Sequence, residues 1–273
     1  MTDSLEITIL GCGSSGGVPR LGGAAGAGDW GVCDPANPKN RRSRCSILAR
    51  RKSAAGETAV LVDTSPDMRE QLLAAHCGRL DAVLITHNHA DQTHGLDDLR
   101  AIAYGGRKRL DLYSDRKSLD GLNDRFGYTF KTPDGSDYPP ILTANEIAPL
   151  RGFEIAGAGG DIPVLPFWQE HGRFGALGFR LGPVAYSSDV SGLSEESFAA
   201  LAGIDCWILD ALRYAPHPTH INVETALAWI ARVKPKRAVL TNLHIDLDYE
   251  TLKRELPAGV EPAYDGMVIA LND

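Results

Sequence analysis

The sequence predicts a single layered α/β domain. Short runs rich in Val, Ile and Leu recur along the 273 residues, and segments of helical character lie between them. Hydrophobic residues make up 43% of the chain and charged residues 23%, so the chain can bury a large core. No internal repeat or compositional break marks a boundary. We therefore expect one domain over residues 1–273.

The expected elements alternate along the chain. Strands are expected where aliphatic residues run almost without interruption, over residues 5–10, 44–50, 58–64, 80–86, 162–168, 175–181, 183–189, 205–211 and 237–243. Helices are expected over residues 66–76, 91–103, 195–202 and 223–233. The first helix has a clear start signal, because Pro66 stands at the first helical position after Ser65.

Two segments lack apolar periodicity. The stretch from about 11 to 44 is rich in Gly, Pro and Arg and is expected to form a long active-site loop, because long loops in compact domains tend to be functional. The stretch from about 127 to 160 contains TPDGSDYPP and GAGG and is expected to be an insertion or lid.

Composition limits the partners. A formal net charge of −7 disfavours nucleic acid, whose binding normally needs a basic excess, but is compatible with a small anionic substrate. Five scattered cysteines without a C-x-x-C pair disfavour a disulfide framework and favour a reducing compartment. The first residues do not resemble a signal peptide, and no apolar run approaches the ~18 residues needed to span a bilayer. We expect a cytoplasmic protein without a membrane partner.

The most specific motif is the run Thr86 to Gly95, which contains H-x-H-x-D directly after a predicted strand. Residues two apart at a strand end point to the same side, so His87 and His89 can present their imidazoles to one cation, with Asp91 nearby. Imidazole and carboxylate are ligands of zinc, manganese or iron in hydrolases. Alone, however, an H-x-H is more often incidental, and Asp91 is also explained as a helix cap.

Other candidate side chains also follow predicted strands. These are His171, Asp189, His217, His220 and His244. Layered α/β folds collect functional groups at strand ends, because the loops there converge on a rigid scaffold. This concentration favours a metal site over an incidental motif.

The pattern of a strand, H-x-H-x-D and then a distant His, Asp and His resembles the metallo-β-lactamase superfamily. The segments Gly11 to Pro19, Val62 to Thr64 and Tyr264 to Met267 resemble its phosphodiesterase branch. That branch includes the phosphoribosyl 1,2-cyclic phosphate phosphodiesterases and, more distantly, the tRNA 3′-processing endonucleases. The resemblance implies a four-layer αββα sandwich with the site along one edge.

The resemblance also implies roles for individual residues. His87, His89 and His171 would bind one divalent ion, Asp189 would bridge to a second, and Asp91 would hold the second. Zinc is the expected metal, with manganese as the alternative. Two positions depart from the pattern, because Gln92 and Asn242 stand where histidines are usual. His244 would then take over as a ligand, or Gln92 would coordinate through its carbonyl oxygen, or the second site would be weak.

The implied reaction is hydrolysis of a small cyclic or nucleotide-like phosphodiester. A metal-activated hydroxide would attack phosphorus, and His220 would protonate the leaving group as general acid, with His217 as the reserve candidate or a substrate contact. Asp91 is the second catalytic candidate, through the metal that it would hold. Ser15 and Arg20 are candidate phosphate contacts.

Further assignments from the sequence are less specific. Arg41, Arg42 and Arg44 lie near the candidate phosphate contacts in sequence, although such a run is often a solvated surface. Asp63 and Asp265 are expected to orient ligand histidines.

Two alternatives remain open. The same fold hydrolyses lactones or thioesters, and a member that binds a metal or ligand without hydrolysis is also compatible with Gln92 and Asn242. Activity on bis(p-nitrophenyl) phosphate, compared with a lactone or thioester, separates these readings. The sequence does not decide whether the chain forms a homodimer.

Overall fold

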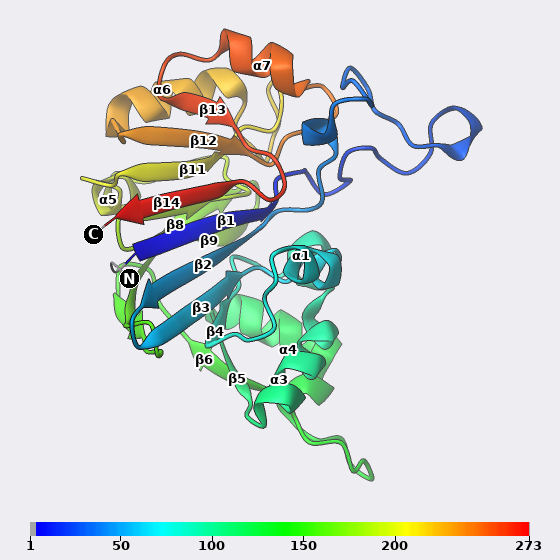
Figure 1. Cartoon of the computed structure of the whole chain (residues 1–273), viewed down its shortest axis with the longest axis vertical. Coiled ribbons are helices and arrows are strands. Elements are labelled where there is room, and N and C mark those ends of the chain that lie inside the picture. The colour runs from blue at the N-terminus through cyan, green and yellow to red at the C-terminus, as the bar shows by residue number, and fades with distance from the viewer. Residues whose placement is uncertain (1–3, 273) are drawn as a thin grey trace.

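Two mixed sheets pack face to face at the centre of the molecule (Figure 1). The computed structural model describes residues 4–272, and in this range each sheet has seven strands. The first sheet has the spatial order β14 (Val268–Asn272), β1 (Ser4–Gly11), β2 (Ser46–Ser53), β3 (Gly56–Val62), β4 (Ala82–Leu84), β5 (Leu110–Ser114) and β6 (Leu142–Glu146). The second has the order β13 (Val260–Pro262), β12 (Arg237–Thr241), β11 (Cys206–Asp210), β10 (Val184–Ser187), β9 (Phe174–Leu181), β8 (Ile162–His171) and β7 (Phe153–Ile155).

Each sheet is antiparallel in one half and parallel in the other. Strands β14, β1, β2 and β3 pair antiparallel, whereas β3, β4, β5 and β6 pair parallel. In the second sheet β7 to β10 pair antiparallel and β10 to β13 pair parallel. Parallel strands end at a common edge, so loops that follow β3, β4, β10, β11 and β12 can converge on one site.

Helices cover the outer face of each sheet. Within the described residues the α-helices are α1 (Met68–Ala74), α2 (Ala90–Thr93), α3 (Leu99–Gly106), α4 (Arg116–Phe130), α5 (Glu195–Ala200), α6 (Val223–Val233) and α7 (Tyr249–Glu255). Leu72, Leu99 and Leu122 join the first helices to the first sheet, and Ala226 and Leu252 join the last ones to the second. A third apolar cluster fills the space between the sheets. The αββα sandwich is confirmed.

Residues 127–160 correct one expectation. This stretch is not an insertion, because β6 and β7 lie within it and form one edge of each sheet. Only residues 131–141, 147–152 and 156–160 lack regular structure there. The expected helix over 91–103 is also interrupted. A Cβ on Gly95 would lie 2.1 Å from the carbonyl oxygen of Ser65, so the chain passes close to that backbone between α2 and α3.

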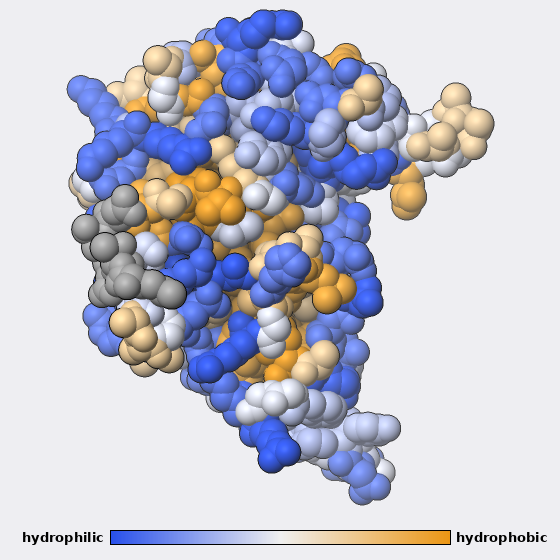
Figure 2. Space-filling model, viewed as in Figure 1, coloured by the Kyte–Doolittle hydropathy of each residue, from blue (hydrophilic) through white to orange (hydrophobic). Residues whose placement is uncertain are grey.

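The long loop after β1 is irregular, as expected, with only short 3₁₀ turns at Ala24–Gly26 and Pro38–Asn40. Gly13 donates its N–H to the Ser43 carbonyl at 2.7 Å, which joins the two ends of the loop, and Leu243 donates to the Cys12 carbonyl at 2.8 Å, which fixes the base to the body. The tip of the loop projects from the molecule (Figure 1), and Figure 2 shows pale and light orange colours at the same place. Leu21 of this loop is fully exposed. None of the helices within residues 4–272 is both long and apolar enough to span a membrane.

Candidate metal centre and active site

The candidate residues meet in a cavity of about 400 Å³ at the carboxyl ends of the parallel strands. It is lined by Ser14, Ser15, Arg20, His89, Asp91, His171, Phe174, Asp189, Leu212, Arg213, His217, Thr219, His220 and His244. His87 lies buried beside it, 2% exposed. Segments far apart in the sequence therefore supply one site, as the strand-end pattern predicts.

Three histidines form the densest part of the site. One ring nitrogen each of His87, His89 and His171 lies within 4.8 Å of those of the other two. Ring centroids are 4.4 Å apart for His87 and His89, and 5.0 and 5.1 Å from these two to His171. Three imidazoles this close together favour a shared cation, because protonated rings would repel one another and neutral imidazoles are metal ligands.

The proton on His87 is fixed by a chain of hydrogen bonds. The Thr86 hydroxyl donates to the buried Asp63 carboxylate at 3.0 Å, and its oxygen lies 3.1 Å from Nδ1 of His87. Because that hydroxyl hydrogen is already used, Nδ1 of His87 carries the proton and donates it to Thr86. The lone pair is left on Nε2, which is buried and has no hydrogen-bond partner among residues 4–272. The expected role of Asp63 is thus exerted through Thr86.

His171 is oriented in the same way. Its Nδ1 lies 2.8 Å from the Thr219 carbonyl oxygen and donates to it, so its Nε2 also carries a lone pair. Burial and the neighbouring imidazoles lower the pKa of His87 well below its usual value, and the same causes lower the pKa of His89. Neutral imidazoles with free lone pairs are the form that binds metal. These residues therefore fit a divalent ion.

Two carboxylates adjoin the histidines. Asp189 follows β10 in a left-handed conformation with φ 53°, and one of its oxygens lies within 4.8 Å of ligand nitrogens of His171 and His220. Burial and the charge of Asp189 raise the pKa of Asp91 to about 6. Between the two lies Gln92, whose Nε2 is 3.0 Å from Asp189 and 3.4 Å from Asp91. An amide donor thus contacts both carboxylates.

His220 is paired with an acid that the sequence analysis did not single out. Nδ1 of His220 donates to Oδ2 of Asp210 at 2.8 Å, and Nε2 lies 3.9 Å from Oδ1 of Asp189. Burial disfavours the imidazolium, but the charge and hydrogen bond of Asp210 outweigh it and raise the pKa of His220 to about 9. Asp210 ends β11 at the same edge as the other site residues. Its place as the last residue of a parallel strand was the available signal.

His244 lines the cavity but belongs to neither group of candidate ligands among residues 4–272. Its Nδ1 lies 2.9 Å from Asp246, which holds the ring within its own loop. The expectation that His244 replaces a missing ligand is therefore not met by this geometry. Asn242 lies instead with its Nδ2 3.1 Å from Nδ1 of His220. His217 lines the cavity too, with Nδ1 3.2 Å from the Thr219 hydroxyl.

The start of the long loop faces the same cavity. Ser15 and Arg20 line it, as the sequence predicts, and so does Ser14, which the sequence analysis did not single out. Within residues 4–272 the buried Ser14 hydroxyl and Nε of Arg20 have no hydrogen-bond partner. Two polar donors without protein partners suit an anionic ligand.

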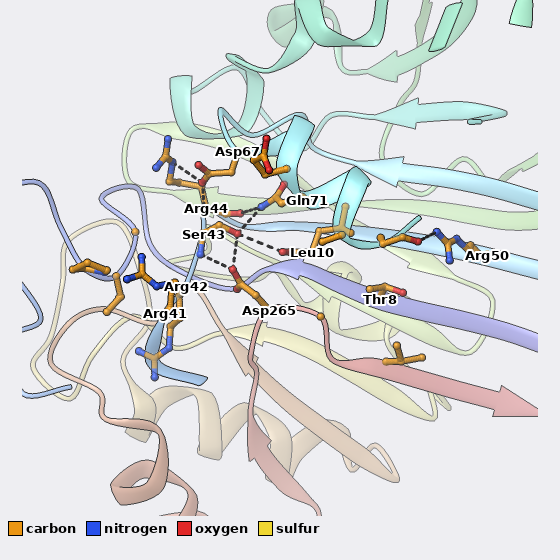
Figure 3. Close-up of a pocket in the computed structure, with 18 residues that line it drawn as sticks. Thr8, Leu10, Arg41, Arg42, Ser43, Arg44, Arg50, Asp67, Gln71 and Asp265 are labelled. Carbon is orange, nitrogen blue, oxygen red and sulfur yellow. Dashed lines mark hydrogen bonds and ion pairs between the residues drawn. The ribbon is translucent and has the colours of Figure 1, made fainter. Parts of the chain in front are cut away.

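The arginine run of the loop faces a different cavity, of about 770 Å³ (Figure 3). Arg44 pairs with Asp67 at 3.1 Å, and the buried Arg42 donates to the Leu247 carbonyl at 2.7 Å. Arg41 lies over the Trp30 ring. These three arginines hold the loop in place and are not phosphate contacts of the histidine cavity.

Asp265 belongs to this second cavity as well. It accepts hydrogen bonds from the Ser43 and Cys12 backbone N–H groups at 2.7 and 3.0 Å. Figure 3 shows its carboxylate directed at Ser43. The expectation that Asp265 orients a ligand histidine is wrong, because its hydrogen bonds fix the base of the long loop.

Comparison with known proteins agrees with this geometry. The profile of the β-lactamase superfamily domain matches residues 58–245, more than half of the chain. A crystal structure of a diphosphatase from the PhnP family is 32% identical, with a TM-score of 0.86 over 99% of this chain and 98% of that one. The chain belongs to the metallo-β-lactamase superfamily. These matches also support the phosphodiesterase branch predicted from the sequence.

Two further similar proteins bear on the metal and on the reaction. Zn²⁺-bound PqqB from Methylobacterium extorquens, with 21% identity and a TM-score of 0.70 over 97% of this chain and 99% of that one, shares the fold. The octanoyltransferase of Porphyromonas gingivalis is 34% identical over 274 residues, which cover 98% of this chain. The aligned residues are 52% of the octanoyltransferase, so the present chain spans about half the length of that relative.

Proposed function

We propose that this protein is a metal-dependent hydrolase of small phosphodiesters and that His220 is its general acid. The observation that carries the proposal is the His220–Asp210 pair next to the metal ligands. The His220 ring lies 4.9 Å from that of His171, and its Nε2 lies 3.9 Å from Asp189. A protonated imidazole beside a metal centre can supply a proton to a leaving group.

The residues divide the chemistry between them. His87, His89 and His171 would hold a divalent ion, which would supply Lewis acidity to the reaction. Asp210 holds the Nδ1 proton of His220, so Nε2 keeps its own proton toward the cavity. That proton can pass to the oxygen of the departing alcohol.

The wall of the cavity favours a small anion. Ser14 and Arg20 offer donors without protein partners, and the half-buried Arg213 adds a second guanidinium. A volume of about 400 Å³ lies within the ~300–1,000 Å³ usual for small-molecule sites. The PhnP-family relative is a diphosphatase, so the candidate substrates include cyclic phosphodiesters, nucleotide-like diesters and diesters of diphosphate.

A second candidate is hydrolysis of a thioester or lactone. It is favoured by the 34% identical relative named octanoyltransferase. Because the matching residues are only 52% of that protein, its name does not locate the transferase activity in the matching half. A third candidate is binding of a metal or ligand without hydrolysis. It does not explain why the buried Asp210 is hydrogen-bonded to His220.

A substrate panel separates these candidates. The metal-loaded protein is assayed with bis(p-nitrophenyl) phosphate, a cyclic ribose phosphate, a diphosphate diester, an octanoyl thioester and a lactone. We expect kcat/KM for at least one phosphorus substrate to exceed that for the acyl substrates by about 100-fold or more, since unpaired polar groups disfavour the wrong class. The reverse order would make the protein an acyl hydrolase. Binding without turnover of any substrate would support the third candidate.

The proposal also covers the metal, the cellular compartment and the partners. Zinc is the proposed metal because imidazoles dominate the ligand set, with manganese as the alternative. All five cysteines are unpaired, which suits a reducing compartment such as the cytoplasm. The proposed partner is the small substrate rather than a nucleic acid or a membrane, and a homodimer stays open.

A further inference from the structure

We infer that the cavity holds one divalent ion, and that the side-chain amide of Gln92 takes the place of a second ion between Asp91 and Asp189. This replaces the two ions expected from the sequence. The inference concerns the number of ions and holds whichever substrate the protein hydrolyses.

The contacts of Gln92 carry the inference. Gln92 lies on α2 and is 1% exposed. Its Nε2 lies 3.0 Å from Oδ2 of Asp189 and 3.4 Å from Oδ2 of Asp91. One amide nitrogen has two N–H groups and can donate to two acceptors. The amide therefore contacts both carboxylates that the superfamily resemblance assigns to the second ion.

The orientation of the amide follows from its neighbours. Ionised carboxylates only accept hydrogen bonds, so the NH₂ end of Gln92 faces Asp91 and Asp189. In this orientation Oε1 is buried and without a partner among residues 4–272. The reversed amide would place three oxygens around one point, a ligand set for a hard cation such as Mn²⁺. The number of bound ions therefore distinguishes the two orientations.

Asn242 removes the other ligand expected for a second ion. It follows β12 in a left-handed conformation with φ 61°, which Asn adopts more readily than most residues. Its Nδ2 lies 3.1 Å from Nδ1 of His220. Both positions that the superfamily pattern fills with histidine thus carry amides that contact other site residues.

The test counts ions in the full chain. Protein purified without chelator and then equilibrated with Zn²⁺ or Mn²⁺ is assayed by mass spectrometry for metal per chain, and the Mn²⁺ form by electron paramagnetic resonance. We expect about one ion per chain and the six-line spectrum of an isolated Mn²⁺, because two-metal sites hold their ions only about 3.5–4 Å apart and couple them.

Variants make the test specific. Gln92→His combined with Asn242→His is expected to raise the metal content to about two ions per chain, the number in two-metal hydrolases. Ser15→His adds a histidine to the wall of the same cavity and is expected to leave the metal content unchanged. Circular dichroism checks that each variant folds, and if the double variant does not fold, the wild-type spectrum alone decides.

Two results would overturn the inference. One is two ions per wild-type chain with an exchange-coupled Mn²⁺ spectrum. The other is loss of a second ion on Gln92→Leu, which would mean that Gln92 is a ligand. Failure of the substrate panel would leave this count unaffected, so the two proposals can fail separately.

Discussion

The two halves of the cavity differ in what they present to a cation. On the side of His87, His89 and His171, hydrogen bonds to Thr86 and Thr219 occupy the Nδ1 atoms and leave lone pairs directed away from them. On the side of Gln92, an amide NH₂ group lies 3.0 Å from Oδ2 of Asp189 and 3.4 Å from Oδ2 of Asp91, which are carboxylate oxygens that could otherwise bind metal. The difference teaches that hydrogen bonds decide which side chains can bind a cation. A histidine whose Nδ1 proton is held by a protein oxygen offers its Nε2 lone pair to a metal, whereas an amide N–H beside a carboxylate takes the place of one.

The largest expected effect comes from the histidine half. His87→Ala removes a ligand, so metal affinity should fall by more than the ~10- to 100-fold typical for loss of an outer partner, and turnover should fall with it. Metal titration against a competing chelator measures the loss. His94→Ala is the matched control, because His94 is exposed one turn along from Asp91 and packs on Phe126. Equal loss in both variants would contradict the assigned ligand set.

The next effect concerns the acid behind His220. Asp210→Asn should lower kcat about 10- to 100-fold, because the imidazolium loses its charge partner and orientation, while the metal content is unchanged. Asp246→Asn is the control, since it alters a His–Asp pair of similar length, 2.9 Å, that does not reach the ligand group. Comparable kinetics of the two variants would show that the pairing of His220 is unimportant.

A smaller effect is expected from the hydrogen-bond chain to Asp63. Thr86→Val removes the acceptor of the His87 proton and should weaken metal binding about 10-fold, with little change in kcat at saturating metal. Thr129→Val removes a buried hydroxyl that bonds Phe126 in α4, so its metal affinity should match wild type. If the metal affinity of Thr86→Val also equals that of the wild type, the hydrogen bonds from Asp63 through Thr86 do not fix the tautomer of His87.

The smallest effects separate the two cavities that border the long loop. Arg20→Ala should raise KM about 10-fold or less, since it removes one charged contact to the substrate. Arg44→Ala should leave kcat and KM within error and lower the free energy of unfolding by about 1 kcal/mol or less, because its pair with Asp67 is partly exposed. A larger KM change for Arg44→Ala would place substrate in the arginine cavity instead.

The sequence predicted what depends on local pattern. The aliphatic strands and the position of His87, His89, His171 and Asp189 at strand ends follow from periodicity and spacing. The edge strands β6 and β7 were not predicted, because they are short, contain exposed positions and lie in a stretch rich in Gly and Pro. Such strands depend on their sheet neighbours rather than on their own residues.

Pairings across the fold could not be read from the chain. Asp210 and His220 are ten residues apart, Gln92 and Asp189 are 97 apart, and nothing local shows that they meet. For the same reason the sequence could not show that Asp265 binds Ser43, 222 residues away.

The measurement that tests the central claim most directly compares two leaving groups in one variant. His220→Ala is assayed, with its metal content, on bis(p-nitrophenyl) phosphate and on a phosphodiester that releases an alkoxide. We predict retained metal and a kcat loss of ~100- to 10,000-fold for the alkoxide substrate, with a much smaller loss for p-nitrophenolate, which leaves without a proton. Equal losses for the two substrates, or loss of the metal itself, would contradict the account and make His220 a ligand or a structural residue.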